Sequence, residues 1–191
     1  MIKLFTLGFL FSYAVERVLE TFWKRSKLHG KIVAPYSLPL IVSAYVSFYL
    51  AIFWDWSQMS EVQFSWWFVS IGIAMVIAST VGRHWAISTL GVYHSIHIEI
   101  REQHDLIESG PYQYTRNPYY LSNIVEAIGL PLIVNSKLAA LIVLLVYLPL
   151  LFHRIVLEEK ALEDKFNGKF IDYRARLPTL IPRLSRSRRR R

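Results

Sequence analysis

The chain has 191 residues, of which 53% are hydrophobic and 15% aromatic, with a mean hydropathy of +0.30 and a net charge of +8. Soluble domains are more polar than this and do not carry repeated long runs without charge. The composition therefore predicts an integral membrane protein, and the length leaves room for one compact bundle. With no cysteine in the sequence, disulfides and thiolate metal sites are excluded.

Five segments of the chain approach the length that a membrane-spanning helix requires, which is about 20 mostly apolar residues. The last two are short and separated only by Asn135-Ser136-Lys137, so they predict a tight helical hairpin, with a re-entrant pair as the alternative. The first lacks a small-residue cleavage site and is expected to be a retained helix rather than a signal peptide. The predicted class is an all-α integral membrane protein with about five transmembrane helices. The segments are Ile2–Phe22, Tyr36–Trp54, Phe64–Val81, Tyr119–Val134 and Leu138–Phe152.

The distribution of lysine and arginine predicts which ends of the helices face the cytosol. Four basic residues lie between positions 24 and 31, whereas the connection after the second segment, from Asp55 to Gln63, has none. The tail ends in four arginines, from Arg188 to Arg191. With five crossings, this pattern predicts an external N-terminus and a cytosolic C-terminus, in a plasma, inner or endoplasmic reticulum membrane.

The connection from Arg83 to Asn117 is the only sizeable polar insertion in the sequence, and the predicted orientation makes it cytosolic. Isoleucines alternate with polar residues over positions 96–101, which predicts a short strand or an extended arm. Ser109-Gly110-Pro111 predicts a turn. Pro118 is placed to open the next helix as its first residue, and the exposed amides there suit a carboxylate or another anionic group.

These boundaries divide the chain into three regions. Residues 1–86 hold three N-terminal helices, and residues 87–182 hold a core with the helical hairpin and a C-terminal segment. Helical character is expected to continue through Phe166, with Gly168 as a helix stop. Residues 183–191 form a basic tail that is expected to be disordered. Its arginines suit anionic lipid headgroups better than nucleic acid, although a simple solvated tail explains them equally well.

Two groups of charged residues are candidates for chemistry. Arg154 and Glu158 lie four residues apart on a predicted helix and therefore share a face. A surface ion pair is the ordinary explanation, but their position just past a charge-free segment, opposite Asn117, favours a functional site. Glu126 lies inside the fourth segment, where a carboxylate is costly and faces a cavity or a partner. A structural and a functional role are equally compatible with that position.

The sequence gives no support for a metal or nucleotide-binding motif. There are six histidines, but His94 and His97 lie three residues apart in an extended segment, which puts their side chains on opposite faces. No metal site is therefore expected. The glycines form neither a dinucleotide fingerprint nor a phosphate-binding loop.

From about Thr89 to Pro182, the order and spacing of the motifs resemble one family of membrane enzymes. The chain is similar to the integral membrane methyltransferases typified by isoprenylcysteine carboxyl methyltransferase, to which phospholipid N-methyltransferases are related. One departure is that the usual Arg-His-Pro of the family is Arg116-Asn117-Pro118 here. The resemblance is carried by His104-Asp105-Leu106-Ile107, Gly110-Pro111-Tyr112, Arg116-Asn117-Pro118-Tyr119-Tyr120, Arg154, Glu158, Glu159, Leu162, Gly168, Tyr173 and Pro182.

The resemblance implies that S-adenosylmethionine binds in a cytosolic pocket formed by the last two helices and the flanking polar segments. It makes Arg154 and Glu158 catalytic residues, with Arg154 facing the substrate, and leaves Glu126 as a candidate for substrate choice. Asparagine at position 117 can still hydrogen-bond the cofactor, but a mechanism that needs an imidazole there is put in doubt. The implied cofactor-binding residues are His97, His104, Asp105, Leu106, Ile107, Tyr112, Asn117, Pro118, Tyr119, Tyr120 and Glu158.

The expected activity is therefore methyl transfer from S-adenosylmethionine to a lipid-like or lipid-modified acceptor. A carboxylate such as that of a prenylcysteine is favoured because Arg154 can pair with it. Methylation of a phospholipid ethanolamine is the alternative, in which Glu126 reaches the amine. A nicotinamide-dependent membrane reductase of related layout and a non-catalytic scaffold are further alternatives.

Overall fold

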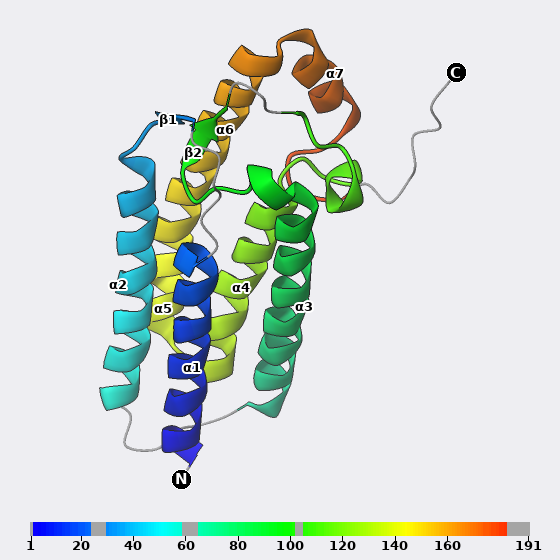
Figure 1. Cartoon of the computed structure of the whole chain (residues 1–191). Helices are drawn as coiled ribbons and strands as arrows, with labels where there is room; N and C mark the ends of the chain where they lie inside the picture. Colours follow the sequence, from blue (N-terminus) through cyan, green and yellow to red (C-terminus); the bar gives the residue numbers. More distant parts are fainter. Residues whose placement is uncertain (1, 24–29, 59–64, 102–104, 183–191) are drawn as a thin grey trace.

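The computed structural model describes residues 2–23, 30–58, 65–101 and 105–182. They form a bundle of long helices with a small two-stranded sheet and a short helix at one end (Figure 1). All five predicted helices are present, which confirms the all-α class. The long helices are α1 (Ile2–Trp23), α2 (Ser37–Gln58), α3 (Trp66–Leu90), α4 (Pro118–Val134) and a continuous rod made of α5 (Lys137–Ile142), the π-helical η3 (Val143–Tyr147) and α6 (Leu148–Phe166).

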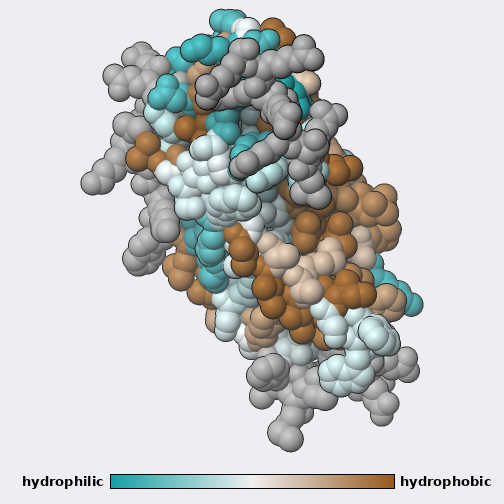
Figure 2. Space-filling view, turned by 90° about the vertical axis from the view of Figure 1, so that its right-hand side faces the viewer, coloured by the Kyte–Doolittle hydropathy of each residue, from teal (hydrophilic) through white to brown (hydrophobic). Residues whose placement is uncertain are grey.

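Three helices in the described part are long and apolar enough to cross a membrane by length and composition. They are Ser37–Gln58, Trp66–Tyr93 and Lys137–Phe166, and Pro118–Val134 is a shorter apolar helix. Hydrophobic side chains dominate the helical body, whereas hydrophilic ones gather at the end that carries the sheet (Figure 2). The molecule is thus built as an integral membrane protein. The number of crossings and the division into three regions stay predictions.

Two helix boundaries differ from those predicted from the sequence. Helix α3 continues past Val81 to Leu90, because Arg83 is fully buried inside the bundle instead of marking the end of the apolar segment. Helix α6 ends before Asn167, which adopts a left-handed φ of 47°, and Gly168 then begins α7 (Gly168–Arg176) instead of stopping a helix. Asparagine tolerates positive φ better than most residues, so it serves as the helix end here.

Helices α3 and α4 pack closely because glycines face each other at their crossing. A Cβ atom built on Gly72 would lie 2.7 Å from the carbonyl oxygen of Gly129, and one on Gly129 would lie 3.0 Å from that of Gly72. Small residues at such a crossing allow the two backbones to approach, as is common between helices in membranes. This contact fixes α4, the helix that carries Tyr120 and Glu126, against α3.

The hairpin predicted between α4 and α5 is confirmed, and α2 fastens its turn. Asn135 ends α4 in the left-handed region with φ 52°, and the Ser136 side chain caps α5 by accepting from the amide of Ala139. The carboxylate of Asp55 accepts from the Ser136 hydroxyl at 2.7 Å and from the Leu138 amide at 3.0 Å. The following rod carries a π-helical turn just before Pro149, which has no amide hydrogen to donate to the preceding turn.

The polar end of the bundle is closed by a two-stranded antiparallel sheet. The predicted strand is confirmed as β2 (Ile98–Ile100), and its partner is β1 (Lys31–Val33), with Lys31 opposite Ile100. Short helical turns, η1 (Gly91–Tyr93) and η2 (Gly110–Gln113), flank the connection. At η2, Gly110 has φ +57°, and a Cβ there would lie 2.5 Å from the Thr89 hydroxyl, so the predicted turn requires glycine. Pro118 opens α4 as its first residue, as predicted.

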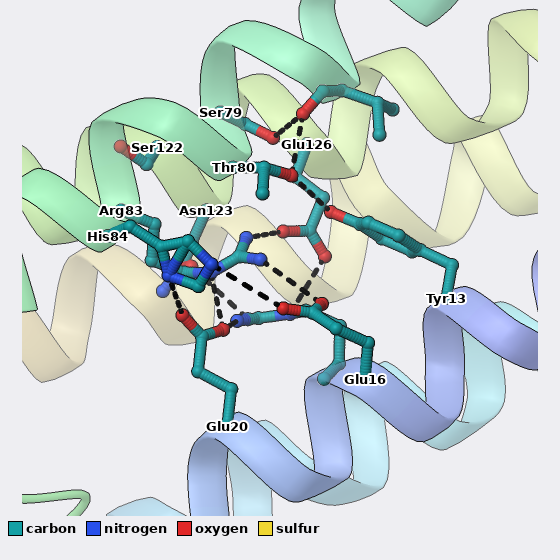
Figure 3. A network of polar contacts seen from close by, with 12 residues as sticks. Tyr13, Glu16, Glu20, Ser79, Thr80, Arg83, His84, Ser122, Asn123 and Glu126 are labelled. Carbon is teal, nitrogen blue, oxygen red and sulfur yellow. Dashed lines mark hydrogen bonds and ion pairs between the residues drawn. The ribbon is translucent and has the colours of Figure 1, made fainter.

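A buried network of charged side chains joins α1, α3 and α4 (Figure 3). Glu126 of α4 is fully buried and pairs with two arginines: Arg17 of α1, whose Nε lies 3.1 Å away, and Arg83 of α3. Glu20 of α1 accepts from both of the same arginines at 2.6 Å. Two cations and two carboxylates therefore compensate each other inside the bundle. An isolated charge at this depth would be energetically costly.

Additional polar groups complete this network. The Tyr45 hydroxyl of α2 donates to Glu126, and Arg17 also donates to the Asn123 side-chain oxygen at 3.3 Å. At the rim, His84 lies 3.2 Å from Glu20 and 3.8 Å from Glu16. These three rim residues bring together atoms that could ligate a metal. Because the Arg83 guanidinium contacts both carboxylates, at 2.6 and 3.6 Å, its positive charge opposes a bound cation.

We predict that Glu126→Gln strongly destabilises the bundle, because the two buried guanidinium groups then share Glu20 alone, with Glu16 only at the rim beside Arg83. Removing one partner of a buried ion pair costs about 3–5 kcal/mol. Thermal or denaturant unfolding of the purified protein in detergent measures the change.

Glu163→Gln is the matched control, since it makes the same substitution in an exposed pair, 2.6 Å from Arg174. A surface ion pair of this kind contributes about 0–1 kcal/mol. Equal losses of stability in the two variants would show that the network does not hold the helices together.

Candidate active site

A cavity of about 500 Å³ opens at the polar end of the bundle and continues along α1 and α2. This is within the usual size range of small-molecule sites, about 300–1,000 Å³. One part is lined by polar and aromatic groups from the 93–107 segment, α4 and α6, and the other by aliphatic side chains of α1 and α2. The cavity thus joins a water-side polar region to an apolar region between helices.

Arg154 of α6 is the cation at the junction of these two regions, and it is only 5% exposed. Its Nε donates to the Tyr120 hydroxyl at 3.0 Å and its Nη1 to the Ser37 hydroxyl at 3.0 Å. Its Nη2 donates to the Ile96 carbonyl at 2.5 Å. Within the described residues, no carboxylate lies at ion-pair distance from Arg154, and the charge of Glu158 acts on it from beyond the Tyr120 hydroxyl.

The Tyr120 hydroxyl connects Arg154 to Glu158. It accepts from Arg154 and donates to the Glu158 carboxylate at 2.5 Å. Tyr120 lies on the first turn of α4 and Glu158 in the middle of α6. The hydrogen bonds therefore bring together the start of α4 and the charged part of α6, which the sequence predicted to share one side of the membrane.

Asn117 stands just before α4 and faces the cavity, where it is held by Glu159. Its side-chain nitrogen donates to Glu159 at 2.7 Å and to the Thr179 carbonyl at 3.2 Å. Arg116 binds the same carboxylate through two nitrogens, both at 3.0 Å. The amide of Asn117 thus takes a fixed orientation, with its nitrogen turned toward Glu159.

Arg116 also fastens the C-terminal segment over the site. Its Nη1 donates to the carbonyls of Arg174 and Leu177, each at 2.9 Å, and its Nη2 donates to the Thr179 hydroxyl at 2.6 Å. Five donors in one planar fork suit this role, which a lysine could not fill. The Arg116 part of the motif is therefore structural, because it closes one wall of the cavity.

Tyr112 and Tyr173 form a neighbouring part of that wall. The Tyr173 hydroxyl donates to the Tyr112 carbonyl at 2.7 Å. Burial, followed by the nearby charge of Glu158, raises the pKa of the Tyr112 hydroxyl well above its usual range. Tyr112 therefore stays neutral at physiological pH and offers an aromatic face and a hydroxyl group to the cavity.

The sheet covers the cavity from above, and Glu99 anchors it. Glu99 accepts from the Gly30 amide and, at 2.9 Å, from the Ser95 hydroxyl, and it lies 3.2 Å from Arg101. Partial burial alone would raise the pKa of Glu99, but the hydrogen bonds from Ser95 and Gly30 and the charge of Arg101 outweigh it and lower the pKa. Glu99 is thus ionised at neutral pH and ties β2 to β1.

The structure places most of the predicted site residues on this one cavity. His97 also lines it, and its buried Nδ1 has no hydrogen-bond partner among the described residues. Pro118 begins α4 behind the lining, and His104 lies outside the described residues. The predicted residues that line the cavity are His97, Asp105, Leu106, Ile107, Tyr112, Asn117, Tyr119, Tyr120, Arg154 and Glu158.

Glu126 lies behind the cavity wall, bound to Arg17 and Arg83, and it is connected to the cavity lining through Arg17 and Tyr45. Glu126 itself is not part of the cavity lining, and its contact with substrate stays a prediction. Three residues that line the cavity or hold its residues were not predicted from the sequence: Ser37, Asn123 and Tyr49. No sequence signal singles them out, because each is an ordinary polar residue in an apolar helix.

A sequence model of the isoprenylcysteine carboxyl methyltransferase family matches residues 72–164. The chain is 31% identical over 127 residues to the uncharacterized protein YpbQ of Bacillus subtilis, covering 66% of this chain and 74% of that protein. It is 29% identical over 119 residues to protein-S-isoprenylcysteine O-methyltransferase B of Arabidopsis thaliana, covering 61% and 60% of the two chains.

A solved structure of the eukaryotic intramembrane Ras methyltransferase ICMT is similar, with a TM-score of 0.54 and 26% identity. The match covers 78% of this chain but 53% of that chain, so the chain spans about half the length of this relative. The comparisons support neither the phospholipid N-methyltransferase nor the reductase alternative. Sequence and fold agree with the resemblance found in the motifs, and the chain belongs to the isoprenylcysteine carboxyl methyltransferase family.

Proposed function

We propose that the protein is a membrane methyltransferase that transfers a methyl group from S-adenosylmethionine to the carboxylate of a lipid-like acceptor, such as a prenylcysteine. The observation that carries the proposal is Arg154, a buried cation on the cavity wall with no carboxylate at ion-pair distance in the described part of the chain. A guanidinium has five N–H groups, and three of them are used. One N–H remains on each terminal nitrogen, which is the arrangement that binds a carboxylate through both oxygens.

The residues around Arg154 fit the implied cofactor. When bound, S-adenosylmethionine supplies a methyl carbon on a positively charged sulfur, which is electrophilic without further activation. The faces of Tyr112 and Tyr120 can stabilise such a cation. The Glu158 carboxylate can accept hydrogen bonds from the ammonium or hydroxyl groups of the nucleoside, and the partnerless His97 Nδ1 offers a further polar contact.

The acceptor side of the reaction needs little acid–base chemistry from the protein. A carboxylate is already ionised at neutral pH, so no general base is required to make it a nucleophile. Arg154 would orient it, and Tyr120 would hold Arg154 and Glu158 in fixed relative positions through its two hydrogen bonds. Alignment of donor and acceptor in a cavity that excludes water then accounts for catalysis.

The apolar part of the cavity supports a lipid-like acceptor. It is lined by aliphatic side chains of α1 and α2, including Val18, Ile41 and Val42. An acceptor could therefore enter from the bilayer while the cofactor enters from water. With the predicted orientation, the polar end, α7 and the C-terminus face the cytosol, and the arginines of the tail would contact anionic lipid headgroups.

The direct test is an assay with the purified protein in liposomes, using labelled S-adenosylmethionine and two acceptors. We expect S-farnesyl-N-acetylcysteine to yield a base-labile methyl ester and phosphatidylethanolamine to yield no product. Methylation of the amine alone would replace the carboxylate proposal with the phospholipid alternative.

We predict that Arg154→Met lowers kcat/KM for the carboxylate acceptor by at least about 100-fold, since a charge-assisted, bidentate contact is lost. Binding of the demethylated cofactor product, followed by calorimetry, should stay within about threefold of wild type. Arg174→Met, in an exposed pair, is the control for loss of an arginine. Equal turnover by Arg154→Met and wild type would remove Arg154 from the acceptor site.

Two further substitutions should affect the cofactor side of the site and not the acceptor side: Glu158→Gln and Tyr120→Phe. We predict that each weakens binding of the demethylated cofactor by about tenfold or more, because hydrogen bonds to a charged group contribute about 1.5–3 kcal/mol. Glu163→Gln and Tyr114→Phe are the matched controls. Unchanged cofactor affinity in both site variants, with intact folding, would contradict the assignment.

A further inference from the structure

The apolar part of the cavity has a polar patch that the proposed reaction does not use. Deeper along α4 and α2 than Tyr120, the lining includes Asn123, Tyr45 and Tyr49, with Arg17 from α1. A plain hydrocarbon chain packed against these groups would leave their polar atoms without partners, which costs free energy. The patch therefore points to an acceptor that carries a polar group on its apolar arm.

Asn123 is the best-defined donor in this patch, and it is only 7% exposed. Its side-chain oxygen accepts from Arg17 Nη2 at 3.3 Å. Because a guanidinium can only donate, the amide must turn its oxygen toward Arg17 and its nitrogen away. That nitrogen carries two N–H groups, and no hydrogen bond from it is formed within the described residues, although Asn123 lines the cavity.

Tyr49 supplies a second donor from α2. Its hydroxyl is buried on the same cavity and has no hydrogen-bond partner among the described residues. Its ring lies against that of Tyr45, with centroids 5.3 Å apart, and the Tyr45 hydroxyl is itself committed to Glu126. Asn123 and Tyr49 are thus two hydrogen-bond donors that the protein does not satisfy by itself in this part of the chain.

The charge around the patch indicates which group it binds. Arg17 is the nearby cation, but Glu126 and Glu20 compensate it. The patch therefore offers donors without net positive charge, which suits a neutral acceptor oxygen better than an anion. A carbonyl oxygen, as in a ketone, ester or amide, matches two donors and needs no acceptor in return.

We propose that Asn123 forms a second subsite, with Tyr49 as a further donor along the same wall, which binds a neutral carbonyl oxygen on the apolar arm of the acceptor. This inference rests on the proposed carboxyl methylation, which fixes the other end of the acceptor at Arg154. Asn123 follows Tyr120 by three residues on α4, a rise of about 4.5 Å along the helix. The carbonyl would accordingly lie on the order of one to two helical turns, about 5–10 Å, from the carboxylate.

The test uses a series of S-alkylated N-acetylcysteines that differ only in the alkyl arm. One carries a plain dodecyl chain, and the others carry a ketone near the sulfur, at the middle of the chain or near its far end. Binding to the protein in liposomes is measured by calorimetry with the demethylated cofactor present, and kcat/KM is measured separately. We expect one ketone, near the sulfur or at the middle, to bind about five- to tenfold more tightly than the plain chain.

Asn123→Leu should remove this preference, and Tyr49→Phe should reduce it, with each ratio taken within one variant so that changes in overall activity cancel. Tyr13→Phe is the matched control, since Tyr13 contacts Thr80 outside the cavity lining and should leave the ratio unchanged. The proposal is overturned if wild type prefers no ketone, or if both site variants keep the preference. Failure of carboxyl methylation would instead appear as absence of methyl ester with every acid, while the binding ratios still report on the subsite.

Discussion

The site depends on the hydrogen bonds of the Tyr120 hydroxyl, which accepts from Arg154 and donates to Glu158. These two bonds connect the start of α4 to the middle of α6, across a helical hairpin whose turn lies at the opposite end of the bundle (Figure 1). A phenol has one proton to donate, so donating it to Glu158 leaves the oxygen free to accept from Arg154. One side chain therefore links the cation and the carboxylate on the cavity wall, while Ser37 and the Ile96 carbonyl hold the other two nitrogens of Arg154.

The sequence predicted the parts of the structure that depend on local patterns. Long apolar segments identified five helices, the hairpin followed from a three-residue turn, and Pro118 marked the start of α4. The polar motifs predicted that Asn117, Tyr120, Arg154 and Glu158 share one cavity, which they do. These features could be predicted because each is encoded within a few residues or within a motif of fixed spacing.

The features that were not predicted arise from contacts between distant segments. Arg83 looked like the end of an apolar segment, but its charge is compensated by Glu20 and Glu126, so α3 continues to Leu90. The partner of β2 lies before α2, and nothing in the sequence near Lys31 indicates the pairing. Ser37 holds Arg154 from 117 positions away. Such pairings depend on the folded arrangement and not on local sequence.

The departure of the motif at position 117 has a structural explanation. Asn117 and Arg116 both bind Glu159, and Arg116 continues to the carbonyls of the C-terminal segment. The side chain at 117 thus acts as a donor to a carboxylate, which an amide does as well as an imidazole. Asparagine cannot titrate, so the wall of the cavity keeps its hydrogen bonds over the whole physiological pH range.

The bundle buries arginines in two different environments. Arg17 and Arg83 share Glu20 and Glu126, so their charges are compensated and their position is explained by helix packing (Figure 3). Arg154 is buried to a similar degree, yet in the described part of the chain it contacts only neutral oxygens. The charge of Glu158 acts on Arg154 only from beyond the Tyr120 hydroxyl, so the guanidinium keeps N–H groups that no carboxylate of the described residues occupies. The difference between the two environments is the physical reason for assigning the anionic acceptor to Arg154 and not to the network around Glu126.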